Sequence, residues 1–216
     1  MTRALDRAVG TVLDALAAEG IVDDTLVFFS SDNGGAGYIG LPDVNKPYRG
    51  WKITNFEGGL RVPMFIKWPG VIEPDTRVSQ PVAHIDVMPT LASAAGAQIP
   101  DDREIDGLNM LPLATGEEGD IRGRETLFWQ SGFYRVVRHD DWKLQVIGDE
   151  MKWLFNLAVD PTEQHNLADQ ALEKLAELQA LLDEHRANAR KPLYPHILES
   201  TIAIDKTRAE RFEPGD

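Results

Sequence analysis

Three side chains in the first quarter of the sequence could bind a charged ligand. Asp32 and Asn33 stand in the run SSDNGG (30–35), directly after a short apolar stretch. Their side-chain oxygens are the hard ligands that calcium and magnesium prefer, whereas a cysteine, or a histidine beside the aspartate, would favour a softer metal such as zinc. Lys52, twenty residues after Asp32, supplies an ammonium group. We expect the three side chains to converge in one cleft.

A simpler interpretation of the same residues is a plain turn and a surface charge. Asp-Asn-Gly-Gly after a strand forms a good turn, because Asn and Gly tolerate positive φ angles, and a single lysine is usually solvated. What favours a site is the run that follows Lys52, FEGGLRVP (56–63), which leads into another apolar segment. Within that run we expect Arg61 to pair with Glu57 or to brace the loop.

The elements around these residues indicate an α/β fold. Residues 26–29 form a short apolar run bounded by turn residues, which predicts a strand buried on both faces, as in a parallel sheet. Ligands of open α/β sheets collect beyond the carboxyl ends of such strands. Residues 3–19 predict an amphipathic helix that ends at Gly20, and residues 64–68 predict a second strand. Helix, short loop and apolar strand fit a doubly wound sheet.

The second half of the sequence has a different pattern. Short strand candidates separated by turn signals predict a small antiparallel sheet of about four strands, and they cover residues 127–130, 134–139, 142–147 and 153–156. A long helix over about residues 171–189 carries leucines on one stripe and should pack on this sheet. Asp160-Pro161-Thr162-Glu163 has the residues of a helix start, with Asp as N-cap.

A coarse division of the chain follows from these patterns. Residues 85–95 predict a helix, and residues 97–123 are punctuated by Pro and Gly, which indicates a loop with a short helical turn. We predict an α/β domain over residues 1–123, a small α+β subdomain over residues 124–190, and a tail over residues 191–216.

The order of the motifs resembles that of the type I sulfatases, within the alkaline-phosphatase-like superfamily. The resemblance rests first on SSDNGG, on Lys52 with FEGGLRVP, and on KWPG (67–70). Further matching runs follow in the same order: HIDVMPTLASAAG (84–96), DGLNMLPLATGE (106–117) and LFNLAVDPTEQHNLAD (154–169).

This resemblance covers about residues 4–169 and implies a fold, an activity and three site residues. The fold would be the C-terminal part of an alkaline-phosphatase-like sandwich, followed by the small four-stranded antiparallel sheet with its helix. The activity would be hydrolysis of sulfate esters. Asp32 and Asn33 would be two ligands of a calcium ion, and Lys52 would contact the sulfate group of the substrate.

The resemblance also implies parts that this sequence does not contain. In the family the nucleophile is a formylglycine, made from Cys or Ser in a C/S-x-P-x-R motif near the N-terminus. This sequence has no cysteine and no Ser-x-Pro-x-Arg, and the family's N-terminal aspartate pair is absent as well. Calcium takes about six to eight oxygen ligands, so Asp32 and Asn33 alone would form an incomplete site. We therefore expect a truncated chain that is inactive by itself.

Composition narrows the range of partners. A formal net charge of −13 over 216 residues, without any basic run, argues against nucleic acid. No apolar run of about 18 residues or more is present to span a membrane. The expected ligand is a small-molecule or carbohydrate sulfate ester. Because the remaining strands of the predicted sheet are missing, we also expect bare apolar surface and self-association, or association with the missing N-terminal portion.

Two functions from other classes stay open. A phosphatase, or a phosphonate or phosphodiester hydrolase of the same superfamily, would normally place histidine beside the aspartate of the metal motif, whereas Asn33 and the Lys52 motif favour a sulfatase. A non-catalytic relic or interaction module would keep the fold without turnover. The coding sequence upstream of Met1 would separate these readings, since it shows whether a C/S-x-P-x-R segment is encoded there.

Overall fold

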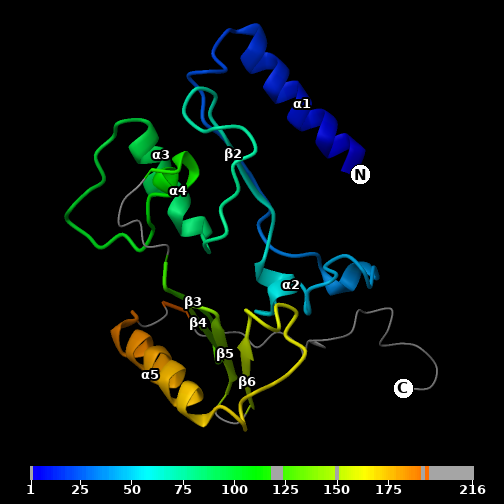
Figure 1. The fold of residues 1–216 in the computed structure, drawn as a ribbon, viewed down its shortest axis with the longest axis vertical. Helices are drawn as coiled ribbons and strands as arrows, with labels where there is room; N and C mark the ends of the chain where they lie inside the picture. Colours follow the sequence, from blue (N-terminus) through cyan, green and yellow to red (C-terminus); the bar gives the residue numbers. More distant parts are fainter. Residues whose placement is uncertain (1, 118–123, 149–150, 191–192, 195–216) are drawn as a thin grey trace. The chain divides into compact units, whose positions relative to one another are not determined.

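The structure, a computed structural model, describes residues 2–117, 124–148, 151–190 and 193–194. The predicted tail at residues 191–216 therefore lies outside the described residues, apart from 193–194. The chain divides into two compact units (Figure 1). We call residues 1–30 with 64–124 the first unit, and residues 31–63 with 125–216 the second unit.

Within its described residues, the first unit holds two strands and four helical segments. In chain order these are α1 (Thr2–Ala18), β1 (Val27–Ser30), β2 (Met64–Lys67), the 3-10 turn η2 (His84–Asp86), α3 (Val87–Ala94) and α4 (Leu111–Thr115). The second unit holds η1 (Gly37–Ile39), α2 (Glu57–Leu60), β3 (Thr126–Ser131), β4 (Tyr134–His139), β5 (Trp142–Ile147), β6 (Met151–Asn156) and α5 (Leu172–Asn188). The elements predicted from sequence patterns are present, within a few residues at their ends, apart from the helix start predicted at Asp160.

The pairing of β1 differs from the sequence prediction. β1 pairs antiparallel with β2, with Val27 opposite Lys67 and Ser30 opposite Met64, and the described residues add no further strand to this sheet. The predicted burial on both faces is also wrong, since Phe29 is exposed and the other β1 residues are half-buried. A two-stranded sheet cannot cover both of its own faces, whatever the apolar content of its strands.

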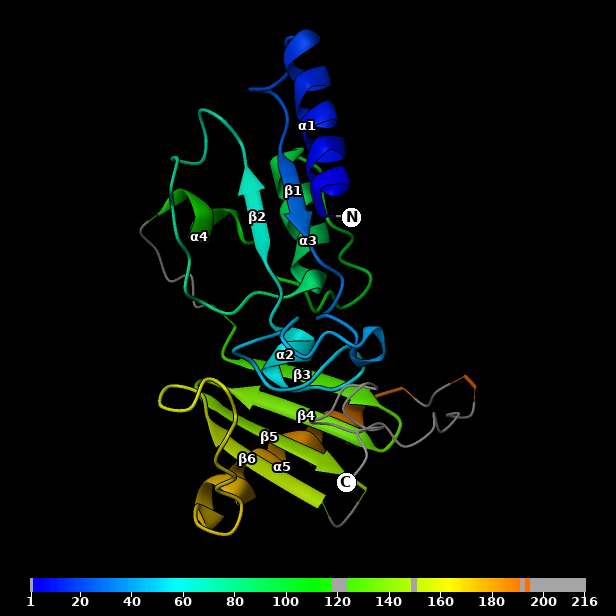
Figure 2. The same cartoon turned by 90° about the vertical axis from the view of Figure 1, so that its right-hand side faces the viewer.

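The four strands of the second unit form one antiparallel sheet in the order β3-β4-β5-β6, as predicted. Successive side chains along a strand point to opposite faces. One face packs on α5, which lies along the sheet in Figures 1 and 2. The core between them is made of aliphatic residues from three strands and from the inner stripe of α5: Val137, Leu144, Val146, Leu154, Leu178 and Leu182.

The opposite face of this sheet is covered by the segment 31–63. Phe56 is fully buried, with its ring 5.5 Å from that of Trp153 and 6.0 Å from that of Phe155, both on β6. Lys143 and Gln145 of β5 point to this face too, because they alternate with Leu144 and its neighbours on the α5 side. The sheet is thus a middle layer between a helix and the segment that contains Lys52.

The predicted helix start at Asp160 is wrong. Residues 161–162 form a turn, and α5 begins at Leu172. The carboxylate of Asp160 accepts hydrogen bonds from the backbone N–H groups of Gln164 (3.0 Å) and His165 (2.8 Å). Glu163 cannot be part of a right-handed helix, because its φ is +58°. Its side chain is fully buried. Burial of that carboxylate against a cation decides the backbone here, in place of the local capping preference.

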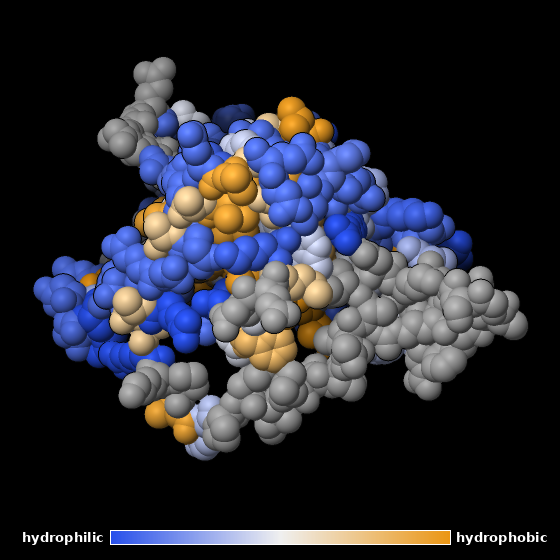
Figure 3. Space-filling model, turned by 90° about the horizontal axis from the view of Figure 1, so that it is seen from below, coloured by the Kyte–Doolittle hydropathy of each residue, from blue (hydrophilic) through white to orange (hydrophobic). Residues whose placement is uncertain are grey.

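The surface carries both hydrophilic and exposed apolar side chains. Figure 3 shows one face, on which hydrophilic residues surround small groups of hydrophobic ones. Among the described residues, no helix combines the length and the hydropathy needed to cross a bilayer. Apolar side chains are nevertheless exposed in the first unit: Leu5 and Val12 on α1 and Phe65 on β2 each have more than half of their surface accessible.

Candidate functional site

The SSDNGG run forms a turn that its own side chains stabilise. The hydroxyl of Ser31 donates to the carbonyl of Asn33 (2.9 Å), and the N–H of Asn33 donates to the Asp32 carboxylate (2.9 Å). Asp32 is exposed and Asn33 is half-buried. The turn predicted as the simpler interpretation is therefore present, which leaves the rest of Asp32 and the side chain of Asn33 available for a ligand.

This turn rests on the two glycines of the FEGG run. The N–H of Gly34 donates to the carbonyl of Gly59 (3.0 Å). A Cβ placed on Gly34 would lie 1.7 Å from the carbonyl oxygen of Gly58, so only glycine allows the two backbones to approach this closely. The pairing of the two Gly-Gly runs explains why both occur in the sequence, and it joins segments 31–35 and 56–61.

Lys52 is attached to the same turn through its backbone. Its N–H donates to the carbonyl of Gly35 (3.0 Å), and its side chain is half-buried. The structure therefore brings the backbone of Lys52 beside the turn that carries Asp32 and Asn33, although seventeen residues separate Gly35 from Lys52 (52 − 35). Asn45 closes the intervening loop, because its amide side chain bonds Gly35 N–H, Gly35 C=O and Gly50 C=O at 2.7–2.9 Å.

The donor atoms around Asp32 suit calcium in kind but not in number. Asp32 and Asn33 supply hard oxygens, and calcium needs about six to eight of them. Across the part of the chain that the structure describes, no group of three or more His, Cys, Asp or Glu side chains is arranged to hold a metal ion. The donor types of Asp32 and Asn33 are those that calcium takes, and further oxygen ligands would be needed to complete a shell.

A buried ion network lies beneath this loop, between it and the sheet. The ammonium group of Lys143 lies 2.8 Å from the carboxylate of Glu57 and 2.9 Å from that of Glu163. Glu163 also accepts from the backbone N–H of Glu57 (2.5 Å) and from the amide of Gln145 (3.1 Å). Lys143, Gln145 and Glu163 are fully inaccessible to solvent, and Glu57 is 5% exposed.

Two further side chains connect the loop to the sheet. Tyr134 of β4 accepts a hydrogen bond from the backbone N–H of Asn55 (3.0 Å) and donates to Gln145. Arg49 donates to the carbonyl of Glu163 (3.0 Å), and its guanidinium lies over the ring of Phe56. As expected, Arg61 reaches Glu57, at 4.0 Å, and it also stacks over the ring of Tyr48.

Burial is the largest cause of the pKa shifts of two side chains in this region. Burial raises the pKa of the Glu163 carboxyl, against the opposing attraction of Lys143 and the hydrogen bond from Glu57 N–H. Burial likewise raises the pKa of the Tyr134 phenol, and the negative charge of Glu163 adds to the rise. Tyr134 therefore remains a neutral hydrogen-bonding group at physiological pH, which suits its position between Asn55 and Gln145.

Sequence reasoning missed the network because of its pattern. Lys143 and Gln145 alternate with apolar residues on β5, which is typical of a solvated face, and the residues around Glu163 predict a helix start. The structure instead covers that face with the segment 31–63. The FEGG run drew attention to Glu57, but nothing in the sequence identified its partners Lys143 and Glu163.

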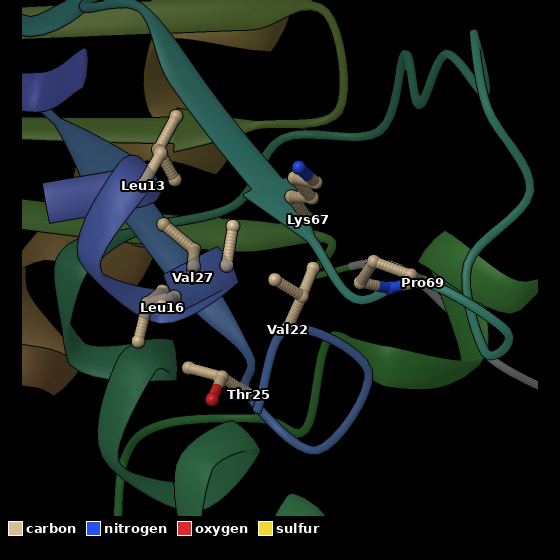
Figure 4. Close-up of a pocket in the computed structure, with 8 residues that line it drawn as sticks. Leu13, Leu16, Val22, Thr25, Val27, Lys67 and Pro69 are labelled. Atoms are coloured by element: carbon tan, nitrogen blue, oxygen red, sulfur yellow. The ribbon is translucent and has the colours of Figure 1, made fainter. Parts of the chain in front are cut away.

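A cavity of about 190 Å³ lies elsewhere, within the first unit (Figure 4). α1 contributes Leu13 and Leu16, β1 contributes Val27, and Lys67 of β2 is the charged residue of the lining. Its walls are otherwise apolar apart from Thr25, and they include none of the predicted site residues. The cavity is therefore a gap between α1 and the two-stranded sheet rather than a polar ligand site.

Comparison with known families agrees with the motif order. A model described as "Sulfatase" matches residues 1–97, and a model described as "N-sulphoglucosamine sulphohydrolase, C-terminal" matches residues 50–191, which is more than half of the chain. The chain belongs to the sulfatase family. The second match includes every residue of the Glu57–Lys143–Glu163 network, so the network lies within the sequence region that the family model describes.

Curated sulfatases match the chain over part of their length. A "Sulfatase" of Formosa agariphila is 40% identical over 189 residues, which is 76% of this chain and 34% of that protein. "Steryl-sulfatase" of Rattus norvegicus is 43% identical over 118 residues, which is 52% of this chain and 20% of that protein. This sulfatase chain thus spans between a fifth and a third of the length of these relatives.

Solved structures agree with the fold. The crystal structure of Ps i-CgsB has a TM-score of 0.78 at 30% identity, covering 91% of this chain and 44% of that one. The chain therefore has the fold of the alkaline-phosphatase-like sulfatases, as the motif order implied. A phosphonate monoester hydrolase from Silicibacter pomeroyi also matches, with a TM-score of 0.66 at 24% identity, and shows the same fold.

Proposed function

We propose that this chain supplies part of the active site of a sulfatase, with Lys52 contacting the sulfate group and Asp32 and Asn33 serving as two calcium ligands. The observation that carries the proposal is the 3.0 Å hydrogen bond from Lys52 N–H to Gly35 C=O, which sets the lysine beside the SSDNGG turn. The proposal adds that the Lys52 ammonium group and the side-chain oxygens of Asp32 and Asn33 face one shared site on the second unit. Membership of the sulfatase family supplies the reaction class.

The proposed roles follow from the charge that sulfate-ester hydrolysis creates. Negative charge grows on the transferred group and on the leaving oxygen, so a fixed cation beside them lowers the barrier. Lys52 meets this need. A bound divalent cation would add charge stabilisation of the same kind, and Asp32 and Asn33 would hold it together with ligands from outside the described residues.

The sequence lacks a precursor for the formylglycine nucleophile of the family, since it has no cysteine and no Ser-x-Pro-x-Arg. The residues present therefore do not fit that group, and the 216-residue chain alone is proposed to have no turnover. Its site would be completed by residues outside this sequence that carry the nucleophile.

The proposed substrate is a small-molecule or carbohydrate sulfate ester. Relatives of this chain carry names from both classes, such as "Steryl-sulfatase" and "N-acetylgalactosamine-6-sulfatase" of Canis lupus familiaris, which is 39% identical over 145 residues. One crystal structure of Ps i-CgsB contains k-i-k-neocarrahexaose, at 30% identity to this chain. Lys52 would contact the sulfate group, which both classes of ester share.

The proposed function can be tested in a chimera. The part of the Formosa agariphila sulfatase that precedes its matching region is joined to this chain, and hydrolysis of a chromogenic aryl sulfate is measured. Lys52→Ala should lower turnover by about 100-fold or more, as loss of one oxyanion-stabilising donor does. Lys67→Ala, at an exposed position of β2, is the matched control for loss of one positive charge. A Lys52→Ala chimera near the unsubstituted rate would refute the sulfate contact.

Parallel substrates separate the other functions. A chimera that cleaves an aryl phosphate or a phosphonate ester faster than the aryl sulfate would establish the phosphoryl-transfer alternative. A folded chimera without activity on any of these esters would favour a non-catalytic module. For the metal, calorimetry on the 216-residue chain should find calcium binding weaker than about micromolar, because tighter binding needs a nearly complete oxygen shell. Tighter binding would contradict the two-ligand assignment.

A further inference from the structure

The turn that carries Lys52 contains a strained residue. Thr54 N–H donates to Trp51 C=O (2.9 Å), which closes a four-residue turn with Lys52 and Ile53 at its centre. Ile53 has φ = +85°, the value that a type II turn requires at its third position, where glycine or asparagine normally stands. A β-branched residue rarely adopts this conformation, because its side chain crowds the backbone.

The side chain of Ile53 does not account for this conformation. It is 47% exposed, so Ile53 is not a core residue whose full burial could compensate for the backbone strain. Strained residues persist where the surrounding structure over-determines them, and they gather at functional sites. The contacts that hold the turn must therefore come from its neighbours.

Those contacts come from α2. A Cβ on Gly59 would lie 2.1 Å from the carbonyl oxygen of Thr54 and 2.5 Å from that of Trp51, so the turn rests directly on the α2 backbone. The hydroxyl of Thr54 bonds both the N–H (2.9 Å) and the C=O (2.8 Å) of Trp51, which tightens the turn from inside. The position of Lys52 is thus set by the position of α2.

α2 in turn needs support from outside, because a four-residue helix is not stable alone. Its support is the buried network at its first residue. Glu57 is joined to Lys143 through its side chain and to Glu163 through its backbone N–H, and Lys143 and Glu163 contact each other. The β5 strand therefore positions α2 through Lys143 and Glu57. α2 positions the Trp51–Thr54 turn through Gly59, and this turn places the N–H of Lys52 against the carbonyl of Gly35.

A buried ion network contributes little to the free energy of folding, because apolar residues of similar size can often replace the charged ones without loss of stability. Its value lies in fixing one geometry. We propose that Lys143, Glu57 and Glu163 are positioning residues for Lys52, which hold the strained Trp51–Thr54 turn in register with the SSDNGG turn. The inference rests on the proposed sulfate contact of Lys52 and extends it to the sheet of the second unit.

The test uses hydrogen exchange on the full 216-residue chain. A neutral variant, Lys143→Met with Glu57→Gln and Glu163→Gln, removes all three buried charges together. Arg61, which loses Glu57 as a partner, is exposed and stays solvated. Amide exchange at Lys52 and Thr54 should become at least tenfold faster, while β4 and β5 amides keep their protection. Unchanged exchange at Lys52 and Thr54 would overturn the proposal. Loss of protection throughout the sheet would overturn it as well, because the network would then serve folding in general.

A second substitution distinguishes positioning from general support. Ile53→Gly removes the strain that the network is proposed to hold. In the neutral variant, Ile53→Gly should restore protection at Thr54 by threefold or more, whereas in the unsubstituted chain it should change little. An equal effect in both backgrounds would show that strain and network are independent, and would refute the proposal.

The positioning role of the network and the sulfate contact of Lys52 can be refuted independently of each other. Exchange rates depend on the turn and not on sulfate, so they test positioning even if Lys52 contacts no substrate. In the chimera, the neutral variant should lower kcat at least tenfold, and Ile53→Gly should recover part of that loss. Faster exchange at Lys52 with no change in kcat would leave the positioning role intact and refute the sulfate contact.

Discussion

Replacing Gly34 with alanine should separate the SSDNGG turn from α2 and displace Lys52. The added Cβ would lie 1.7 Å from the carbonyl oxygen of Gly58, whereas real Cβ contacts stay beyond 3.0 Å. The two backbones must therefore move apart by at least 1.3 Å (3.0 − 1.7). Neither side offers a flexible side chain that could give way, because the opposing atoms belong to the backbone.

The cost of this movement follows from the bonds that it breaks. Gly34 N–H loses its bond to Gly59, and the neighbouring bond from Lys52 N–H to Gly35 is strained or lost. Each such bond contributes about 0.5–1.5 kcal/mol, and more when a buried group is left unpaired. We expect a local loss of roughly 2–4 kcal/mol, which corresponds to amide exchange about 30- to 700-fold faster at Lys52.

The assay compares exchange in the Gly34→Ala chain with that in a Gly10→Ala chain. Gly10 lies in α1 with nothing within 4 Å of an added Cβ, so alanine there should stabilise the helix by about 1 kcal/mol. The same chemical change should thus have opposite effects at the two sites.

In the chimera, Gly34→Ala should lower turnover by about 100-fold, since a shift of about 1 Å at a reacting centre has that effect. Exchange at Lys52 within twofold of the unsubstituted chain would refute the reasoning, because it would mean that the two Gly-Gly runs can separate without moving Lys52.

Three further predictions concern stability and association. Burial alone would raise the pKa of Asp160, but hydrogen bonds from the N–H groups of Gln164 and His165 outweigh this effect, so the pKa is lowered. The ionised Asp160 therefore stabilises the folded chain above about pH 4. This stabilisation is lost as pH falls through the folded-state pKa. Asp160→Asn should be less stable than the unsubstituted chain at pH 7 and nearly equal to it at pH 2, measured by urea unfolding; a constant difference would contradict this. Leu178 lies on the buried side of α5, and Leu178→Ala should lower the free energy of unfolding by about 2–5 kcal/mol. Leu172 is 64% exposed on the same helix, and Leu172→Ala should lower it by less than about 1 kcal/mol. The exposed side chains of α1 and β2 should drive self-association, which Phe65→Glu should reduce in sedimentation velocity; a monodisperse unsubstituted monomer would contradict it.

The sequence by itself determined the local elements and the family. Short strand-forming runs separated by Gly and Asp turns predicted β3–β6, and the leucine stripe predicted α5. Both patterns depend only on residues within one element and its turns. The motif order identified the sulfatase family and directed attention to Asp32, Asn33 and Lys52. Each of these inferences uses residues that are close together in the chain, where local physics is sufficient.

Only the tertiary structure decided what covers each face. Lys143 and Gln145 have the pattern of solvated residues, yet they are buried because the segment 31–63, about 80 residues earlier, covers that side of β5 (143 − 63). The apolar run of β1 predicted burial on two faces, yet its antiparallel pairing with β2 leaves Phe29 exposed. Burial depends on partners distant in sequence, and no local pattern names them.

Glu163 shows the same limit at the level of one residue. Asp160 and Pro161 favour a helix start, but the carboxylate of Glu163 gains a cation and two N–H donors in the interior, and its backbone adopts φ = +58° to reach them. A local preference of about 1 kcal/mol is smaller than the cost of leaving that network without one of its charges. The sequence could therefore predict the residues of the candidate site, while the interactions that hold Lys52 in place arise only when distant segments pack together.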